Sequence, residues 1–129
     1  MQEKPFDIWN EVKKKTDKSK RAPIKPGEVY WCRIGLNIGV EQDGCGYEYV
    51  RPVLIIKKFS DEIALAAPLT TRAKSGNWYF PLSHFGATSC AILNQARPLD
   101  TKRLLESMGE ISENELQKVI VAYCALISS

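Results

Sequence analysis

Residues 51–70, RPVLIIKKFSDEIALAAPLT, decide the fold class of this chain. They contain two short, mainly apolar strand-like runs, Pro52 to Phe59 and Ile63 to Leu69, joined by the polar turn Ser60-Asp61-Glu62. Runs of this length that are rich in branched aliphatic residues and bounded by turn residues are typical of β-strands. Proline is tolerated at the first residue of a strand, where Pro52 stands. The stretch therefore predicts two neighbouring strands that pair in one sheet.

Further segments of the same kind lie on both sides of this pair. They are short and rich in β-branched and aromatic residues: Glu28 to Ile34, Trp78 to Leu82 and Ser89 to Gln95. A last strand is expected near Met108 to Ile111, after a short turn from Thr101 to Leu105 that Asp100 caps. Short strands with close turns predict a mainly β fold, either a small barrel or a curled sheet.

The end of the chain carries the clearest helix pattern. Ser112 and Glu115 have the spacing of a capping box. Apolar residues then recur on one helical face, at Leu116, Val119, Ile120, Tyr123 and Ile127. We expect a C-terminal amphipathic helix that lies across the barrel.

Residues 1–26 form a basic N-terminal extension, with eight Lys or Arg against four Asp or Glu. Phe6, Trp9 and Val12 recur at helical spacing, which predicts a short helix from about Pro5 to Lys15. Prolines and a glycine near residue 26 separate the extension from a domain spanning residues 27–129. Two interpretations are open: the extension packs Phe6 and Trp9 on the domain, or it is an RNA-binding arm.

Composition fits one globular domain, with 129 residues, 44% of them hydrophobic, and a net charge of +3. The longest apolar run, Val119 to Ile127, is far shorter than the roughly 18 residues that cross a bilayer. The N-terminal residues are polar and lack the pattern of a signal peptide. We expect a cytoplasmic protein without a membrane span.

The four cysteines lack the paired spacing of a zinc site, and His84 is the single histidine. We expect Cys32 and Cys90 to be buried thiols, and Cys45, between two glycines, to be the exposed one. No metal or cofactor is expected.

Three polar groups stand where a small β domain exposes its side chains. They are Glu41-Gln42-Asp43, in a segment with four glycines between residues 35 and 46; Arg51, at the base of a strand; and Thr70-Thr71-Arg72, at the end of the next. Glycine-rich loops on small domains are often functional. Pairing of the two strands would bring the groups together. Each also has a plain structural explanation, such as an ion pair of Arg51 with Glu41 or Asp43.

Four segments, taken in their order along the chain, resemble the MazF/PemK toxins, which are the ribonuclease halves of bacterial toxin–antitoxin pairs. The segments are GVEQDG at 39–44, RPVLII at 51–56, PLTT at 68–71, and AILNQARPLD at 91–100 followed by Arg103-Leu104. The resemblance runs from about Lys25 to Ile127. It implies an SH3-like barrel with a C-terminal helix, usually a homodimer, and a MazE/PemI-like antitoxin as partner. It also implies sequence-specific, metal-independent cleavage of single-stranded RNA, leaving a 2′,3′-cyclic phosphate and a 5′-hydroxyl.

Carried over by motif, the family's catalytic arginine falls on Arg51, its catalytic threonine on Thr70 and its loop glutamate on Glu41. A guanidinium suits a phosphate that gains negative charge, because it stays protonated and binds phosphate through two N–H groups. For the same reason it is a poor general base, so Glu41 is the candidate to accept the 2′-hydroxyl proton.

Residues expected to bind RNA surround these three: Gln42, Tyr47, Thr71, Arg72, Lys74 and Gln95. Tyr47 is the preferred base-stacking residue. Trp31, Trp78 and Tyr79 are further candidates for stacking, although aromatic residues of strands more often lie in a core. Eight residues separate Gln42 from Arg51, more than is usual in the family, so the RNA sequence that is read does not carry over.

Two alternatives remain on the same fold. CcdB-like toxins bind DNA gyrase instead of cutting RNA, but the chain ends Tyr123-Cys-Ala-Leu-Ile-Ser-Ser, without the Trp-Gly-Ile ending of that family. The other alternative is an inactive relative that only binds nucleic acid.

Overall fold

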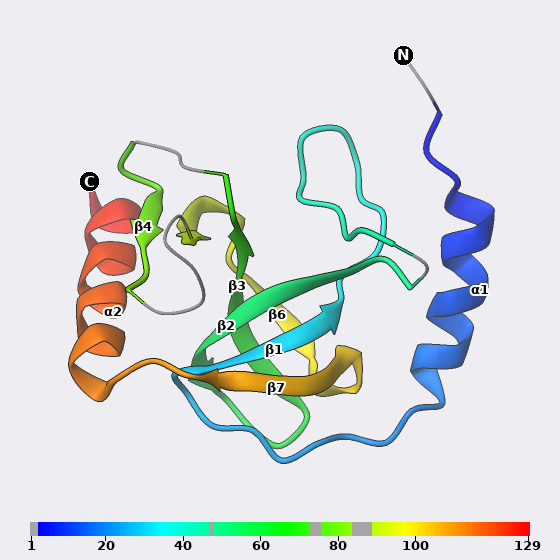
Figure 1. Ribbon diagram of the computed structural model, residues 1–129, viewed down its shortest axis with the longest axis horizontal. Helices are drawn as coiled ribbons and strands as arrows, with labels where there is room; N and C mark the ends of the chain where they lie inside the picture. The colour runs from blue at the N-terminus through cyan, green and yellow to red at the C-terminus, as the bar shows by residue number, and fades with distance from the viewer. Residues whose placement is uncertain (1–2, 47, 73–75, 84–88) are drawn as a thin grey trace.

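The computed structural model describes residues 3–46, 48–72, 76–83 and 89–129 (Figure 1). Two α-helices flank a β-sheet and two short 3₁₀-helices interrupt its last strands. In chain order the elements are α1 (Phe6–Asp17), β1 (Glu28–Arg33), β2 (Val50–Lys58), β3 (Ile63–Thr70), β4 (Tyr79–Pro81), β5 (Cys90–Ile92), η1 (Leu93–Gln95), β6 (Arg97–Asp100), η2 (Thr101–Arg103), β7 (Leu104–Glu110) and α2 (Glu113–Ser128).

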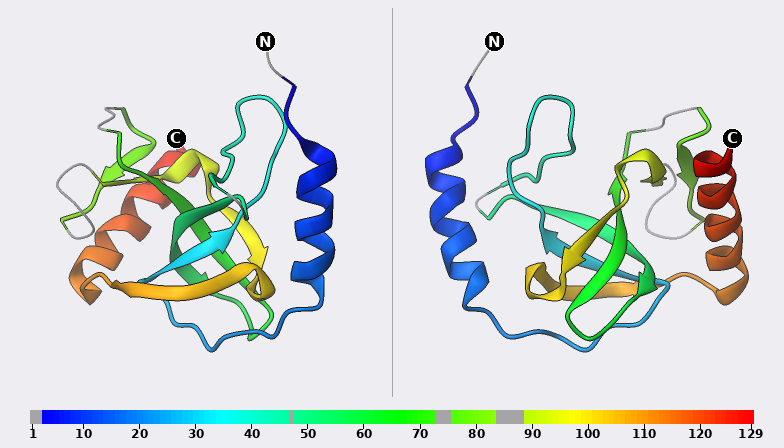
Figure 2. Two further views of the ribbon diagram at one scale, coloured as in Figure 1. Left: turned by 45° about the vertical axis from the view of Figure 1, so that its right-hand side comes forward. Right: turned by 180° about the vertical axis from the view of Figure 1, so that it is seen from behind.

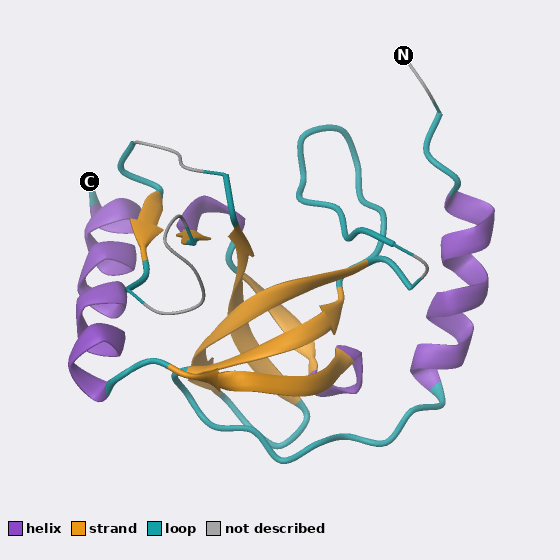
Figure 3. Cartoon of the chain, in the orientation of Figure 1, coloured by secondary structure: helices purple, strands orange, loops and turns teal. Residues whose placement is uncertain are grey.

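The seven strands form one antiparallel sheet in the order β4-β5-β3-β2-β1-β7, and β6 pairs with β3. The predicted pairing of β2 with β3 is confirmed, with Val53 opposite Pro68 and Lys58 opposite Ala64. The first half of β3 pairs with β6, whereas its last residues pair with β5. The strands are strongly twisted, and the sheet curls around its own core (Figure 3). This is the small, curled β fold that the sequence predicted.

Both faces of the central strands are buried, which explains their continuous apolar runs. Val53 and Ile55 point into one core cluster, together with Cys32, Ala66 and Leu104. The alternate residues of β2 join a second cluster on the other face, built from the sheet and α2: Val29, Leu54, Ile56, Leu116 and Val119. Alternate side chains of a strand point to opposite faces, so one run supplies two cores.

Several strand boundaries differ from the prediction. The segment from Ser89 to Gln95 is a strand only to Ile92 and then turns into η1. β6 was not predicted, because it is short and contains Pro98. The last strand, β7, begins at Leu104 instead of near Met108, since its exposed side chains give no apolar alternation.

Helix α2 begins at the predicted cap, where the Ser112 hydroxyl accepts a hydrogen bond from Glu115 N at 3.0 Å. The Glu115 carboxylate completes no capping box but accepts hydrogen bonds from Ser83 N and Oγ. Leu116 and Val119 are buried, whereas Ile127 is 67% exposed. Tyr123 and Leu126 of the later turns are partly buried and also pack against the core. The helix therefore packs on the core from its first turn to its last, as predicted, and of the predicted apolar stripe Ile127 faces outward.

Helix α1 lies at the opposite end of the sheet from α2 (Figure 2). Trp9 is buried, which the packing interpretation predicted, but Phe6 is 43% exposed. The extension is thus part of the folded body and is anchored by one aromatic residue instead of two.

Cys32 and Cys90 are buried as predicted. The expectation that Cys45 alone is exposed was wrong, because Cys124 on α2 also faces outward. No helix of the described residues is long and apolar enough to cross a membrane.

Candidate active site

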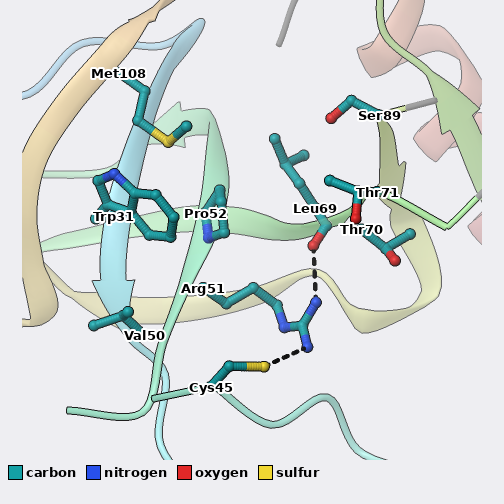
Figure 4. Close-up of a pocket in the computed structure, with 10 residues that line it drawn as sticks. All are labelled: Trp31, Cys45, Val50, Arg51, Pro52, Leu69, Thr70, Thr71, Ser89 and Met108. Atoms are coloured by element: carbon teal, nitrogen blue, oxygen red, sulfur yellow. Dashed lines mark hydrogen bonds between the residues drawn. The ribbon is translucent and has the colours of Figure 1, made fainter. Parts of the chain in front are cut away.

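Arg51 is held between the glycine-rich loop and the end of β3. Its Nε donates to the carbonyl of Asp43 at 2.7 Å, and Nη1 donates to the carbonyl of Leu69 at 3.2 Å. Nη2 lies 3.7 Å from Cys45 Sγ (Figure 4). These contacts come from two separate segments and fix the plane of the guanidinium group. Neither Glu41 nor Asp43 supplies the carboxylate partner that the sequence allowed.

A groove runs past Arg51, and we call it the Arg51 groove. One part, about 270 Å³, is mostly apolar and lies over β1, β2 and β7, with Trp31, Pro52 and Met108 in its wall. The adjoining part, about 450 Å³, is lined by polar residues: Gln42, Thr70, Thr71, Arg72 and Tyr79. Both parts share Cys45, Arg51, Thr70 and Thr71. The guanidinium therefore lies where a polar and an apolar wall meet.

Thr70 is the last residue of β3, and the pairing of β2 with β3 brings it into the groove with Arg51. Its Oγ1 accepts a hydrogen bond from Arg72 N at 3.2 Å. A hydroxyl group has one proton and two lone pairs. With the oxygen accepting from the backbone, the hydroxyl proton can be donated to a ligand in the groove.

Gln42 lines the polar part of the groove, and Gln95 contacts the loop beside it without lining the groove. Gln42 N donates to Gln95 Oε1 at 3.2 Å, and Gln95 Nε2 donates to Val40 O at 3.4 Å. With the Gln42 amide oxygen turned toward Arg51, it accepts from Nη2 at 2.8 Å and from Nε at 3.2 Å. Gln95 thus holds the loop against η1, and Gln42 faces the guanidinium.

Glu41 is not brought to Arg51. Its Oε1 accepts a hydrogen bond from Ile38 N at 2.8 Å, within the loop, and Glu41 lines neither part of the groove. The carboxylate of Asp43 also turns away, toward Asn37 N at 2.6 Å and Lys4 Nζ at 2.8 Å. The loop presents a main-chain carbonyl, a sulfur atom and the Gln42 amide to Arg51, while both carboxylates stabilise the loop itself.

The remaining expected site residues divide into two groups. Thr71 and Arg72 line the polar part of the groove. Tyr47 and Lys74, like His84, lie outside the residues that the structure describes. Trp31 and Trp78 are 38% and 44% exposed, so the expectation that strand aromatics belong to the core was wrong for both. Trp31 stands opposite Pro52 in the register of β1 and β2 and forms the apolar wall.

Sequence reasoning named Asp43 as a carboxylate partner of Arg51 and missed that it acts through its carbonyl, and it also missed the contributions of Cys45 and Leu69 to the site. Two of them act through main-chain carbonyls, which leave no mark in residue type. The flanking glycines of Cys45 placed it in a loop, but only the fold brings its sulfur to Arg51. Within the described residues, no three His, Cys, Asp or Glu side chains are grouped so that they could hold a metal ion.

A family model described as the PemK-like, MazF-like toxin of type II toxin–antitoxin systems matches residues 25–126. Among solved structures, Deinococcus radiodurans MazF superposes with a TM-score of 0.66 at 22% identity, covering 84% of this chain and 99% of that chain.

Two toxin–antitoxin complexes are also similar. A MazE–MazF complex of Deinococcus radiodurans gives a TM-score of 0.60 at 19% identity, covering 83% of this chain and 98% of that chain. A mycobacterial endoribonuclease in complex with its cognate antitoxin gives 0.57 at 18% identity, covering 84% of this chain and 96% of that chain. No functionally curated protein sequence matches the chain.

Proposed function

Since this chain belongs to the PemK-like, MazF-like toxin family of type II toxin–antitoxin systems, we propose that it is a sequence-specific endoribonuclease that cleaves single-stranded RNA without a metal ion. Its products are a 2′,3′-cyclic phosphate and a 5′-hydroxyl, and cleavage inhibits translation and growth. The observation that carries the proposal is the guanidinium of Arg51, fixed by main-chain acceptors beside the Thr70 hydroxyl in an open groove.

The reaction forms a bond between the RNA 2′-oxygen and phosphorus and breaks the bond to the 5′-oxygen. The 2′-hydroxyl loses a proton, the departing 5′-oxygen gains one, and negative charge builds on the phosphoryl oxygens in between. Arg51 stabilises that charge from a fixed position, so no reorganisation is needed as the charge develops. Thr70 supplies a second donor. The permanent charge of Arg51 suits it to hold the phosphate and to donate a hydrogen bond to the leaving oxygen, and the proton that this oxygen gains comes from water in the open groove.

Glu41 is the proposed acceptor of the 2′-hydroxyl proton. Its carboxylate now bonds Ile38 N, so this role requires the loop to rearrange when RNA binds. The RNA strand is proposed to follow the groove, with phosphates near Arg51, Thr71 and Arg72, and with Gln42 and Gln95 beside the bases. Trp31 offers an exposed aromatic face for stacking, and Tyr47 and Lys74 stay proposed contacts.

For partners, we propose a homodimer that a MazE/PemI-like antitoxin neutralises. Support comes from the similar solved structures that contain a toxin bound to its antitoxin. An acidic antitoxin segment would occupy the groove in place of RNA. Light scattering of the purified chain tests the dimer, and rescue of growth by the antitoxin tests the neutralisation.

The decisive experiment incubates purified protein with a long unstructured RNA in EDTA and maps the new 5′ ends and the 3′ cyclic phosphates. We expect cuts at one short motif, and a loss on the order of a thousandfold in Arg51→Ala. Equal cutting by Arg51→Ala would refute the mechanism. RNA that is retained but never shortened would indicate a binding protein, and absence of both would direct attention to gyrase.

A further inference from the structure

The N-terminal extension reaches the loop that positions Arg51. Lys4 Nζ donates to the carbonyls of Asn37 at 2.6 Å and Gly39 at 3.2 Å, and it pairs with Asp43 Oδ2 at 2.8 Å. The ammonium group thus has three acceptors within the loop, one for each of its N–H bonds. Residues 3–24 precede the residues that the family model matches, so this contact is an addition to the family domain.

Asp43 connects Lys4 to the candidate active site. Its carboxylate binds Lys4 and Asn37 N, while its carbonyl accepts the hydrogen bond from Arg51 Nε at 2.7 Å. The carboxylate and the carbonyl of Asp43 share one Cα atom, so contacts that hold the carboxylate restrict where the carbonyl can lie. Asp43 therefore links the Lys4 ammonium to the Arg51 guanidinium through one polar contact on each side.

Helix α1 also packs against the base of the same loop. The Trp9 ring packs on Gly35 and meets the Tyr49 ring at 74°, with centroids 5.9 Å apart. Gly35 and Tyr49 are joined by a backbone hydrogen bond of 3.1 Å that closes the loop. Near the other end of α1, Lys15 pairs with Glu48, which also binds Arg33. The extension holds the loop at its base and near its tip.

Three cations of the extension form ion pairs with acidic residues of the folded domain. Lys4 and Lys15 each pair with an acidic residue of the loop, and Arg21 pairs with Asp100 of the body at 3.0 Å. This favours a bracing role for the extension over that of an RNA-binding arm, because these cations are already neutralised within the protein.

From these contacts we propose that Lys4 is a positioning residue for the ribonuclease reaction: through Asp43 it fixes the loop carbonyl that orients Arg51. The effect of Lys4 on catalysis rests on the proposed function. The orientation of Arg51 by Lys4 does not depend on that function. Lys4 does not touch the reacting atoms.

Kinetics on the full chain test the proposal with three variants: Lys4→Ala, Lys4→Arg and Lys14→Ala. Lys14 contacts only Glu11 of its own helix among the described residues, so its variant removes the same charge from the same segment without reaching the loop. We expect Lys4→Ala to lower kcat about tenfold with little change in KM, at a temperature where circular dichroism shows every variant folded. Lys4→Arg should restore the rate, and Lys14→Ala should match the wild type.

Equal losses in Lys4→Ala and Lys14→Ala, or a rise in KM alone, would overturn the proposal, since they indicate attraction of RNA by general charge. Nuclear magnetic resonance gives a readout that needs no cleavage: the Arg51 Nε–Hε signal should exchange slowly with water in the wild type and faster in Lys4→Ala. If the wild-type protein cuts no RNA but this signal responds to Lys4, the proposed function fails and the positioning role stands. An Arg51 signal unaffected by Lys4→Ala would refute it whatever the activity.

Discussion

The indole ring of Trp9 lies so close to Gly35 that only a glycine fits beneath it. A Cβ atom on Gly35 would stand 2.1 Å from Cζ2 of the ring, and the Gly35 backbone has a φ of +86° that favours glycine. Arg103 approaches the same ring, with its Cζ 5.9 Å from the centroid, and donates to the carbonyls of Arg33 and Ile34. The helix, the end of β1 and the base of the loop meet at this contact.

This contact predicts a strong and specific cost for Gly35→Ala. The added methyl group collides with the ring and the positive φ is strained, so we expect a loss of about 3 kcal/mol in the free energy of unfolding. Urea denaturation measures it. Gly39→Ala is the matched control, because its φ of +55° is also positive while no atom lies within 4 Å of the new Cβ. In a Trp9→Ala background the Gly35→Ala cost should shrink, and full additivity would contradict the collision.

The Thr70 hydroxyl is predicted to contribute through its proton. Thr70→Val keeps the shape of the side chain and removes the donor, so the rate of RNA cleavage should fall roughly hundredfold. Thr70→Ser retains the hydroxyl and should keep most of the activity. Cleavage time courses with one RNA substrate distinguish the two variants, and a fully active Thr70→Val protein would remove Thr70 from the mechanism.

Acid should weaken the docking of α1 through Glu48. Hydrogen bonds from Lys15 and then Arg33 hold the pKa of Glu48 below its ordinary value of 4.5. A lowered pKa in the folded state means that the stabilisation is complete above pH 4.5 and is lost as the pH falls through the folded value. Melting temperatures from about pH 7 to about pH 3 should therefore fall more steeply for the wild type than for Glu48→Gln. The control Glu106→Gln, an exposed substitution on β7, should show the same dependence of melting temperature on pH as the wild type. Parallel curves for all three proteins would contradict the prediction.

Thiol reactivity should divide the four cysteines into two unreactive buried residues and two reactive exposed residues. Burial raises the pKa of the Cys32 thiol to about 12, and Cys90 is also buried, so neither should react with iodoacetamide while the protein is folded. Cys45 and Cys124 are exposed and should be labelled. Peptide mass spectrometry locates the label, and unfolding in urea should make all four react. RNA bound in the groove should protect Cys45 but not Cys124, since only Cys45 lines the groove.

Local patterns were sufficient to predict the central strands and the start of α2. The strands β2 and β3 contain continuous apolar runs because their side chains supply two cores, and the close turn between them makes them neighbours in the sheet. Ser112 caps α2 through a bond that spans three residues. The pairing of these strands also brought Arg51 and Thr70 together, as predicted.

Other features depended on segments that are distant in the sequence. The strand β6 forms because β3 offers it an open edge, and its own residues do not favour a strand. The outward position of Cys124 and Ile127 depends on how much of α2 the sheet covers.

The sequence by itself determined which residues form the central strands β2 and β3, where the C-terminal helix begins, and that Arg51 and Thr70 stand on neighbouring strands, because these depend on periodicity, capping and short turns. Only the tertiary structure decided the partners of Arg51 and the fate of Glu41. Several acceptors could bind the guanidinium of Arg51. The path of the loop, held by Lys4 and Trp9, places the Asp43 carbonyl against Arg51 and the Glu41 carboxylate against Ile38 N, and the end of β3 supplies the Leu69 carbonyl. That choice is made by contacts across more than thirty residues, which no local pattern records.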